Sequence, residues 1–217
     1  MADVAAPETT ITSGPTDGSF ITSNTAVFEF TGMDNLTPSQ ELGFQTKLND
    51  TDWSATSLDT SASFIGLTEG THQFSVRAVD LAGNVDPTPA SRTWTIDTTP
   101  PSAPAVITGK VNPATTISVS ASAVDEISGI SNFEYAVVQC QDVTGVTWMS
   151  AGPGPELVID GLSLTAGERY FLAMRAINGA GLTGPAGFSS AFIAVGEQIL
   201  SENFDSVCVR DGGLAKE

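Results

Sequence analysis

A single sequence pattern occurs twice in this chain and restricts the folds that it can adopt. The first copy is FIGLTEGTHQFSVRAVDLAGNVDP, residues 64–87, and the second is VIDGLSLTAGERYFLAMRAINGAGLTGP, residues 158–185. In both copies, Gly-Leu and a polar turn precede an alternating apolar stretch that ends in Arg-Ala, and Ala-Gly and Pro follow. The pairs Arg77-Ala78 and Arg175-Ala176 lie 98 residues apart. Solenoid repeats span roughly 20–50 residues, so the pattern predicts two copies of a whole domain, each a β-sandwich.

Short apolar or alternating stretches recur along the chain at roughly ten-residue intervals, separated by Gly, Pro, Asn, Asp and Ser, which is typical of a sandwich. No stretch carries the helical apolar period over about 11 residues. The sequence therefore predicts an all-β chain. Strands are expected near residues 10–12, 26–31, 42–48, 63–67, 72–79 and 92–96 in the first half, and near 105–108, 116–121, 132–139, 147–150, 157–159, 169–177 and 188–195 in the second.

The expected domain organisation is two sandwiches in tandem. Pro100 and Pro101 stiffen the connection between them toward an extended form, so we expect a short, semi-rigid joint. The predicted parts are a disordered lead (1–7), a first sandwich (8–98), a linker (99–104), a second sandwich (105–196), and a tail or the start of a further β segment (197–217).

The strong negative charge argues against two classes of partner. The formal net charge is −17, from 25 acidic and 8 basic residues. Nucleic-acid binding requires Lys and Arg to neutralise phosphates, and an anionic membrane surface would repel this chain. No apolar run approaches the roughly 20 residues of a membrane span. We therefore expect neither nucleic-acid binding nor membrane insertion, whereas cation binding remains open.

The first residues, MADVAA, carry neither the basic nor the apolar segment of a secretory signal peptide. We expect the chain to be a piece of a larger secreted protein. Cys140 and Cys208 allow either one disulfide or two unpaired thiols, and the sequence does not choose between them. The chain has no Cys/His cluster of the kind that holds structural zinc.

Calcium is the leading metal hypothesis, since no other cofactor is indicated. Hard cations prefer several oxygens from carboxylates and loop carbonyls, and the loops of this chain are rich in such groups. Turn chemistry explains the same residues, because Asp and Asn cap backbone groups in loops, and both interpretations stay open. The candidate ligands are Asp80, Asn84 and Asp86 in the loop between the last two strands of the first half, and Asp97, Asp125 and Glu126 around the linker.

Catalysis is not predicted. His72 is the only histidine, and a catalytic base needs a nucleophile and an orienting carboxylate beside it, for which the sequence shows no motif. Trp53, Trp148 and Phe188 raise a different possibility, the stacking of aromatic rings on sugars. Each lies in or beside an expected strand, where burial is the commoner outcome.

Both halves resemble known bacterial modules. Residues 66–86, GLTEGTHQFSVRAVDLAGNVD, and 94–101, WTIDTTPP, resemble the bacterial Ig-like repeats of large secreted and surface proteins. In the second half, DEISGI at 125–130 followed by FEY at 133–135 is similar to fibronectin type III domains of bacteria. The resemblance covers about 190 of the 217 residues. It implies the sandwich fold, which hosts many different functions.

The fibronectin-like segment from Gly161 to Tyr170 implies a further detail. Tyr170 occupies the position of the corner tyrosine, whose hydroxyl bonds to backbone nearby. The first half has a shorter turn, which places Gln73 at the matching distance from Gly70. We therefore expect this device to be missing or replaced in the first sandwich.

The resemblance favours a non-catalytic pair of structural or adhesive modules, a stalk or binding domains, in a large secreted or surface-displayed bacterial protein. Such a pair would act outside the cell, and its ligand would be a protein or a glycan on a cell surface. Two alternatives remain. In the first alternative, the chain is an accessory segment of a secreted enzyme that degrades polysaccharide or protein. In the second, it is a component of a virion or filament that displays Ig-like domains. The sequence does not indicate an oligomeric state.

Overall fold

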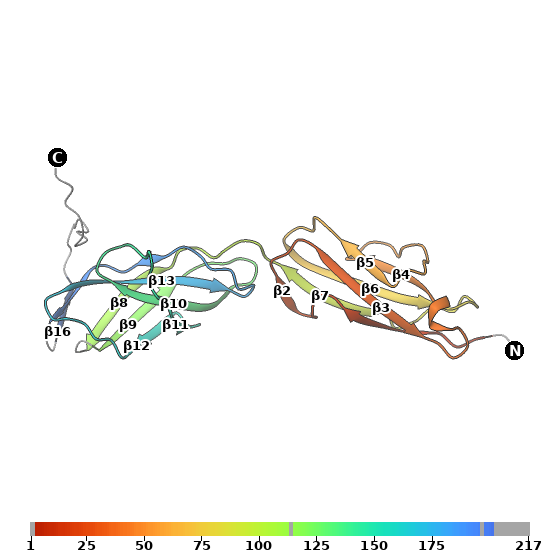
Figure 1. Ribbon diagram of the computed structural model, residues 1–217, viewed down its shortest axis with the longest axis horizontal. Helices are drawn as coiled ribbons and strands as arrows, with labels where there is room; N and C mark the ends of the chain where they lie inside the picture. Colours follow the sequence, from red (N-terminus) through yellow and green to blue (C-terminus); the bar gives the residue numbers. More distant parts are fainter. Residues whose placement is uncertain (1–2, 113–114, 196–197, 202–217) are drawn as a thin grey trace. The chain divides into compact units, whose positions relative to one another are not determined.

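The computed structural model describes residues 3–112, 115–195 and 198–201, and the chain divides into two compact units, Met1–Thr98 and Thr99–Glu217 (Figure 1). We call them the first unit and the second unit. In the described residues, strands make up all regular structure except one 3-10 turn, η1 (Ser39–Glu41). The all-β prediction is confirmed. None of the described residues belongs to a helix that is long and apolar enough to cross a membrane.

Two sheets form the first unit. One has the order β1-β3-β5 and the other the order β2-β7-β6-β4. Neighbouring strands are antiparallel except β2 and β7, the strands of the second sheet that come first and last along the chain, which run parallel. The sequence analysis did not predict β2. The strands are β1 (Glu8–Ser13), β2 (Ser19–Ile21), β3 (Ala26–Met33), β4 (Gly43–Leu48), β5 (Ser61–Phe64), β6 (Gly70–Val79) and β7 (Ala90–Ile96).

Aromatic side chains fill the core of the first unit. The period of two along β3 directs Phe28 and Phe30 inward, as predicted, and both are buried. The Phe28 ring stacks on that of Phe74 with centroids 4.2 Å apart, and it packs against Trp94 at 5.1 Å. These side chains come from β3, β6 and β7, so they join the two sheets.

Two sheets also form the second unit. One has the order β12-β9-β8, and the other has the order β11-β10-β13-β15-β16 with β14 paired to β13. The strand β16 pairs with β15 in an antiparallel hairpin. The strands are β8 (Ala105–Asn112), β9 (Thr116–Ser122), β10 (Ile130–Val138), β11 (Met149–Gly152), β12 (Glu156–Ile159), β13 (Arg169–Asn178), β14 (Gly187–Phe188), β15 (Phe192–Val195) and β16 (Gln198–Ser201).

The central strand β13 is buried on both faces. Leu172 and Met174 point into the main core, while Phe171 and Ala173 belong to a smaller apolar cluster on the other face. The loop after β10 covers that smaller cluster with Trp148 and its neighbours. A strand that packs on both faces reads as a continuous apolar run, which explains the sequence RYFLAMRAIN.

The Pro-rich segment 99–104 lies within the second unit. Pro101 and Pro104 are buried there. Their carbonyl oxygens approach the backbone so closely that a Cβ placed on Gly184 or Gly187 would collide with them. Glycine is therefore required at both positions for steric reasons.

The predicted corner tyrosine is confirmed. The Tyr170 hydroxyl accepts a hydrogen bond from the Thr165 N–H at 3.0 Å. In the sheet, Tyr170 pairs with Phe192 and packs near its ring.

The predicted counterpart of Tyr170 in the first unit, Gln73, is wrong by one residue. His72 pairs with Trp94. Tyr170 lies 98 residues after His72, and its partner Phe192 lies 98 residues after Trp94, so the two pairs are equivalent in the repeat. His72 is 6% exposed, and its Nε2 lies 2.8 Å from the Thr68 carbonyl oxygen. A histidine therefore replaces the tyrosine, and it too bonds to backbone a few residues upstream.

We expect Tyr170→Phe to lower the free energy of unfolding of the second unit by about 1 kcal/mol, because the Thr165 N–H loses its partner. Denaturant unfolding of the full chain would measure this. The matched control is Tyr135→Phe, which removes a hydroxyl that makes no hydrogen bond within the described residues. Equal losses from both variants would contradict a specific role for the Tyr170 hydroxyl.

Candidate functional site

The loop after β6 contains Asp80, Asn84 and Asp86, which were predicted as calcium ligands. Asp80 is 6% exposed. Both of its carboxylate oxygens accept hydrogen bonds from Asn84 at 2.7 Å, Oδ1 from the backbone N–H and Oδ2 from the side-chain nitrogen. Asn84 thus presents a donor toward Asp80, and turn chemistry accounts for its place in the loop.

Asp86 connects this loop to the first strand. It is 1% exposed, and its Oδ2 accepts a hydrogen bond from Thr9 Oγ1 at 2.6 Å. The same hydroxyl oxygen accepts the Ala78 N–H at 2.8 Å. Oδ1 of Asp86 accepts the N–H and the hydroxyl of Thr88 at 2.8 and 3.0 Å. These bonds fasten β1 to the end of β6 and occupy both Asp86 oxygens.

The structure instead brings Asp80 together with two carboxylates that the sequence analysis did not consider, Asp3 and Asp34. One oxygen from each of the three residues lies within 4.8 Å of the other two. Asp3 precedes β1, Asp34 follows β3 and Asp80 follows β6. We call this group the Asp3–Asp34–Asp80 cluster. Its oxygens belong to the ligand class that hard cations prefer.

Asp34 has one satisfied and one unsatisfied oxygen. Its Oδ2 accepts the Thr37 and Leu36 N–H groups at 2.7 and 2.9 Å. These bonds, that from Thr37 first, lower the pKa of the Asp34 carboxyl below its ordinary value. Its Oδ1 is buried and has no hydrogen-bond partner among the described residues. A buried acceptor without a donor is unfavourable and requires an explanation.

The second predicted set, Asp97, Asp125 and Glu126, is divided between the units. Asp97 is fully buried in the first unit, and its N–H donates to the Ile21 carbonyl at 2.9 Å. Asp125 and the exposed Glu126 belong to the second unit. Calcium binding by these three residues together stays a prediction.

Asp125 organises a loop of the second unit. Its Oδ1 accepts the N–H groups of Ile127, Ser128 and Gly129 at 2.9–3.2 Å, and its Oδ2 accepts Nδ2 of Asn178 at 3.0 Å. Burial alone would raise the pKa of the Asp125 carboxyl. The hydrogen bonds from Asn178 and the backbone outweigh burial, and the pKa is lower than its ordinary value.

The two tryptophans considered for sugar stacking each carry a cation on a ring face. The Arg77 guanidinium carbon lies 4.2 Å from the centroid of the Trp53 ring, and Lys47 Nζ lies 5.1 Å from it. In the second unit, the Arg175 guanidinium carbon lies 4.4 Å from the Trp148 ring centroid. Such cation–π pairs stabilise a side-chain arrangement, and they cover a ring face that a sugar would otherwise use.

Each of these arginines is also held from the neighbouring strand. Arg77 Nε donates to Gln45 Oε1 at 2.8 Å, and Arg175 pairs with the Glu134 carboxylate at 2.6 Å. Phe188, the third aromatic residue considered, packs against the smaller apolar cluster of the second unit. All three aromatic side chains therefore have structural partners.

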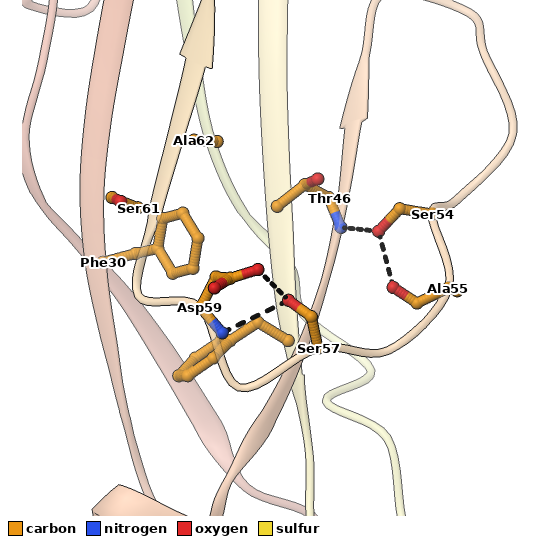
Figure 2. A pocket seen from close by; sticks show the side chains of 9 residues that line it. Phe30, Thr46, Ser54, Ala55, Ser57, Asp59, Ser61 and Ala62 are labelled. Atoms are coloured by element: carbon orange, nitrogen blue, oxygen red, sulfur yellow. Dashed lines mark hydrogen bonds between the residues drawn. The ribbon is translucent and has the colours of Figure 1, made fainter.

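A small pocket opens in the first unit between β4 and β5, with a volume of about 330 Å³. Figure 2 shows that Ser57 and Asp59 lie beside it and bond to one another, with Ser57 Oγ donating to Asp59 Oδ2 at 3.0 Å. Ser54 Oγ accepts a hydrogen bond from the Thr46 backbone N–H at 3.0 Å. The polar groups thus satisfy each other. The lining residues are Phe30, Phe44, Thr46, Ser54, Ala55, Ser57, Asp59, Ser61 and Ala62.

The structure gives His72 a structural role. Its Nδ1 lies 3.2 Å from the Asn49 side-chain nitrogen, and its Nε2 faces the Thr68 carbonyl, so both ring nitrogens have partners that organise turns. Cys140 is partly buried and lies two residues after the end of β10. Cys208 lies outside the described residues, so the state of the two thiols stays a prediction.

Asp3 and Asp34 were not among the predicted ligands, for identifiable reasons. Asp3 lies in a lead that was predicted to be disordered, yet the structure describes residues 3–7 and buries Pro7. Asp34 lies in the loop after β3, and the corresponding loop of the second half, between β9 and β10, contains Asp125. An alignment of the two copies loop by loop would have drawn attention to Asp34.

No protein-family model matches this chain, and a comparison with curated proteins finds no match. Among solved structures, it is similar to the fibronectin(III)-like modules of Clostridium thermocellum CbhA, with 14% identity, a TM-score of 0.49, and coverage of 87% of this chain and 94% of that chain. For the FN1-FN3 domains of chicken CNTN1 the identity is 16% and the TM-score 0.48, over 88% of this chain and 66% of that chain. For domains A168-A170 from titin, the identity is 13% and the TM-score 0.59, over 88% of this chain and 67% of that chain. The titin likeness supports the fold, tandem sandwiches of the Ig-like and fibronectin III-like kind.

We expect Asp125→Asn to lower the free energy of unfolding of the second unit by about 1–2 kcal/mol at pH 7, since its hydrogen bonds involve a charged group. The folded-state pKa of Asp125 lies below its ordinary value. The stabilisation is therefore complete above the unfolded-state pKa, near 4, and is lost as the pH falls through the folded-state pKa. Denaturant unfolding of both proteins at several pH values measures the difference. A difference that is constant from pH 7 down to pH 2 would contradict this account.

Proposed function

We propose that this chain is a load-bearing, non-catalytic pair of modules in a large secreted or surface-displayed bacterial protein, where it acts as a stalk outside the cell. The observation that carries the proposal is the parallel pairing of β2 with β7. These strands lie near the two ends of the first unit, with Ser19 opposite Trp94 and Ile21 opposite Ile96. The Asp97 N–H extends the pairing by donating to the Ile21 carbonyl at 2.9 Å.

Parallel pairing determines how such a unit responds to force. Tension applied to the chain ends meets β1 first. Where the tension passes on to β2, it pulls the start of β2 and the end of β7 in opposite directions along the strands. The hydrogen bonds between the strands are then loaded together, in shear. In the second unit, all pairs between described strands are antiparallel. The first unit is therefore the more resistant of the two in this proposal.

Two further observations support a structural role. The cations on Trp53 and Trp148 hold these rings as part of the scaffold. The net charge of −17 favours repulsion between copies of the chain and keeps them apart. An adhesive role for the same modules, with a protein or glycan ligand, is compatible with this arrangement and would use surface residues other than these tryptophans.

We expect single-molecule stretching of the full chain, held between marker domains, to show two unfolding events at different forces. The higher force should belong to the first unit. Ile21→Pro should remove the difference, because proline cannot donate a backbone hydrogen bond and disturbs strand pairing.

Phe20→Pro is the matched control. Backbone groups of alternate residues point to opposite sides of a strand, so Phe20 points its groups away from β7 when Ile21 faces it. Its side chain is 41% exposed, so little core packing is lost. Equal forces for the two units in the unmodified chain, or an equal effect of both proline variants, would sink the load-bearing proposal.

A further inference from the structure

One sheet of the first unit differs in charge from the rest of the chain. Its four strands, β2, β4, β6 and β7, contain no Asp or Glu, although the chain has 25 acidic residues. They do contain Lys47, Arg77 and Arg92. The Arg92 guanidinium donates to three backbone carbonyl oxygens in β1 and the turn after it, each at 3.2 Å. Lys47 and Arg77 lie on the opposite, outer face of the sheet, because side chains alternate along a strand.

Arg77 is held in place while its two terminal nitrogens stay without a partner. Its guanidinium lies on the Trp53 ring, and its Nε donates to Gln45 Oε1 at 2.8 Å. Gln45 is fixed in turn, since its Nε2 donates to Thr56 Oγ1 at 3.1 Å. Among the described residues, neither Arg77 Nη1 and Nη2 nor Lys47 Nζ has a hydrogen-bond or ion-pair partner. Two positive groups are therefore positioned beside one ring without a negative group.

The equivalent stack of the second unit contains that negative group. Gln45 pairs with Arg77 in one sheet, and Glu134 pairs with Arg175 in the other. Because the two arginines are 98 residues apart in the repeat, Gln45 and Glu134 are equivalent positions. Glu134 Oε2 lies 2.6 Å from both Nε and Nη2 of Arg175. The second unit thus shows that this arginine stack accepts a carboxylate, which the first unit does not supply itself.

The face around the stack is covered in the second unit and open in the first. The 98-residue period aligns Gln73 with Phe171 and Ser75 with Ala173. Phe171 and Ala173 are buried in the smaller apolar cluster, under the loop after β10. Gln73 is instead exposed, and its side-chain amide makes no hydrogen bond within the described residues. The first unit therefore leaves a polar sheet face accessible next to its two cations.

Hydroxyl groups and one aromatic ring complete this outer face. The hydroxyls of Thr71 and Ser75 bond to those of Thr95 and Ser91 across β6 and β7, at 3.1 and 2.9 Å. Phe20 lies opposite Thr95 and is 41% exposed. It is the one large apolar side chain exposed in these four strands. A protein partner needs an apolar centre with buried anchors, which this face lacks, whereas the hydroxyls of a sugar match its hydroxyl and amide groups.

We propose that the outer face of this sheet binds a glycan that carries carboxylates, as a uronic acid does. One carboxylate binds to Lys47 Nζ and the terminal nitrogens of Arg77, since arginine matches the planar carboxylate in two hydrogen bonds. Trp53 holds the cations in place, and Phe20 offers a ring on which a sugar stacks. The net charge of the chain permits this binding, because exposed charges beyond about 8 Å are largely screened at physiological salt.

This inference names the ligand class for the adhesive form of the proposed function, on which it rests. It is independent of the stalk role, because binding is measured without force. Failure of the binding experiment would leave the stretching result unaffected, and the reverse also holds.

The test is an NMR titration of the isotope-labelled full chain with short acidic oligosaccharides from pectate, alginate and hyaluronan. With at least one of them, we expect saturable shifts that are confined to the outer face of β4, β6 and β7 and to the Arg77 side chain. The affinity should fall with added salt, because the ions screen the charges. The methyl-esterified pectate oligosaccharide has the same sugars without the charge, and it should bind at least about tenfold more weakly than its acid, if the acid is a ligand.

Gln45→Glu is the decisive variant, because it gives the first unit the carboxylate that the second unit already has. We expect a folded protein whose affinity for the oligosaccharide is about tenfold lower or less, since Arg77 then has an internal partner. Lys47→Gln should weaken binding as well, and it serves as the second variant if Gln45→Glu does not fold. The matched control is Gln40→Glu, the same change at an exposed position in η1, outside the sheet. It should leave the affinity unchanged.

Three results would overturn the proposal. The first is a titration in which none of the three acidic oligosaccharides gives saturable shifts. The second is a set of folded Gln45→Glu and Lys47→Gln proteins that bind as the unmodified chain does, or a Gln40→Glu protein that loses as much affinity as Gln45→Glu. The third is tighter binding of hexaglutamate than of any oligosaccharide at the same signals, which would assign the face to an acidic peptide.

Discussion

The alternation of side chains along β6 and β13 organises each unit. Along β6, His72, Phe74, Val76 and Ala78 are buried on one face, and Arg77 on the other face reaches Trp53. Along β13, Ala176 is buried while Arg175 stacks on Trp148. Successive side chains of a strand point to opposite faces. In each Arg-Ala pair, the alanine therefore faces the core and the arginine faces outward, onto a tryptophan ring. The core, the corner residue and the loop that follows all depend on the register of this strand.

Most of the fold was predictable because its signals are local. Alternating apolar residues and turn residues identify strands without knowledge of their partners, and nearly every strand was expected close to its observed position. The stretch expected as one strand near 188–195 is divided into β14 and β15. The strand β2 was not expected, because it has only three residues and its position depends on its parallel pairing with β7. A pairing between residues more than 70 positions apart leaves no mark in the local sequence. For the same reason, the sequence did not show that residues 99–104 pack on the second unit.

The candidate site was predictable only in part. Asp80, Asn84 and Asp86 were predicted as calcium ligands from their loop, where all three bond to the protein itself, and calcium binding by them stays a prediction. The partners that the fold brings to Asp80 come from two other segments, which no spacing rule connects. The 98-residue period did contain useful information, since it aligns His72 with Tyr170. That alignment identifies His72 as a corner residue.

The glycines that face the Pro-rich segment have a consequence for how the two copies can diverge. Asp86 in the first unit corresponds to Gly184 in the second. Asp86 fastens the first strand through a carboxylate bonded to Thr9, whereas Gly184 allows close backbone contact with Pro101 in the segment before β8. A substitution at either position is therefore acceptable only together with a change in the segment that it contacts, β1 in the first unit and the Pro-rich segment in the second. Each of these two residues should therefore vary together with the segment that it contacts in its own copy, and independently of the other copy. Exchange of a single loop between the domains would separate these partners and would be selected against, even though the frameworks are alike.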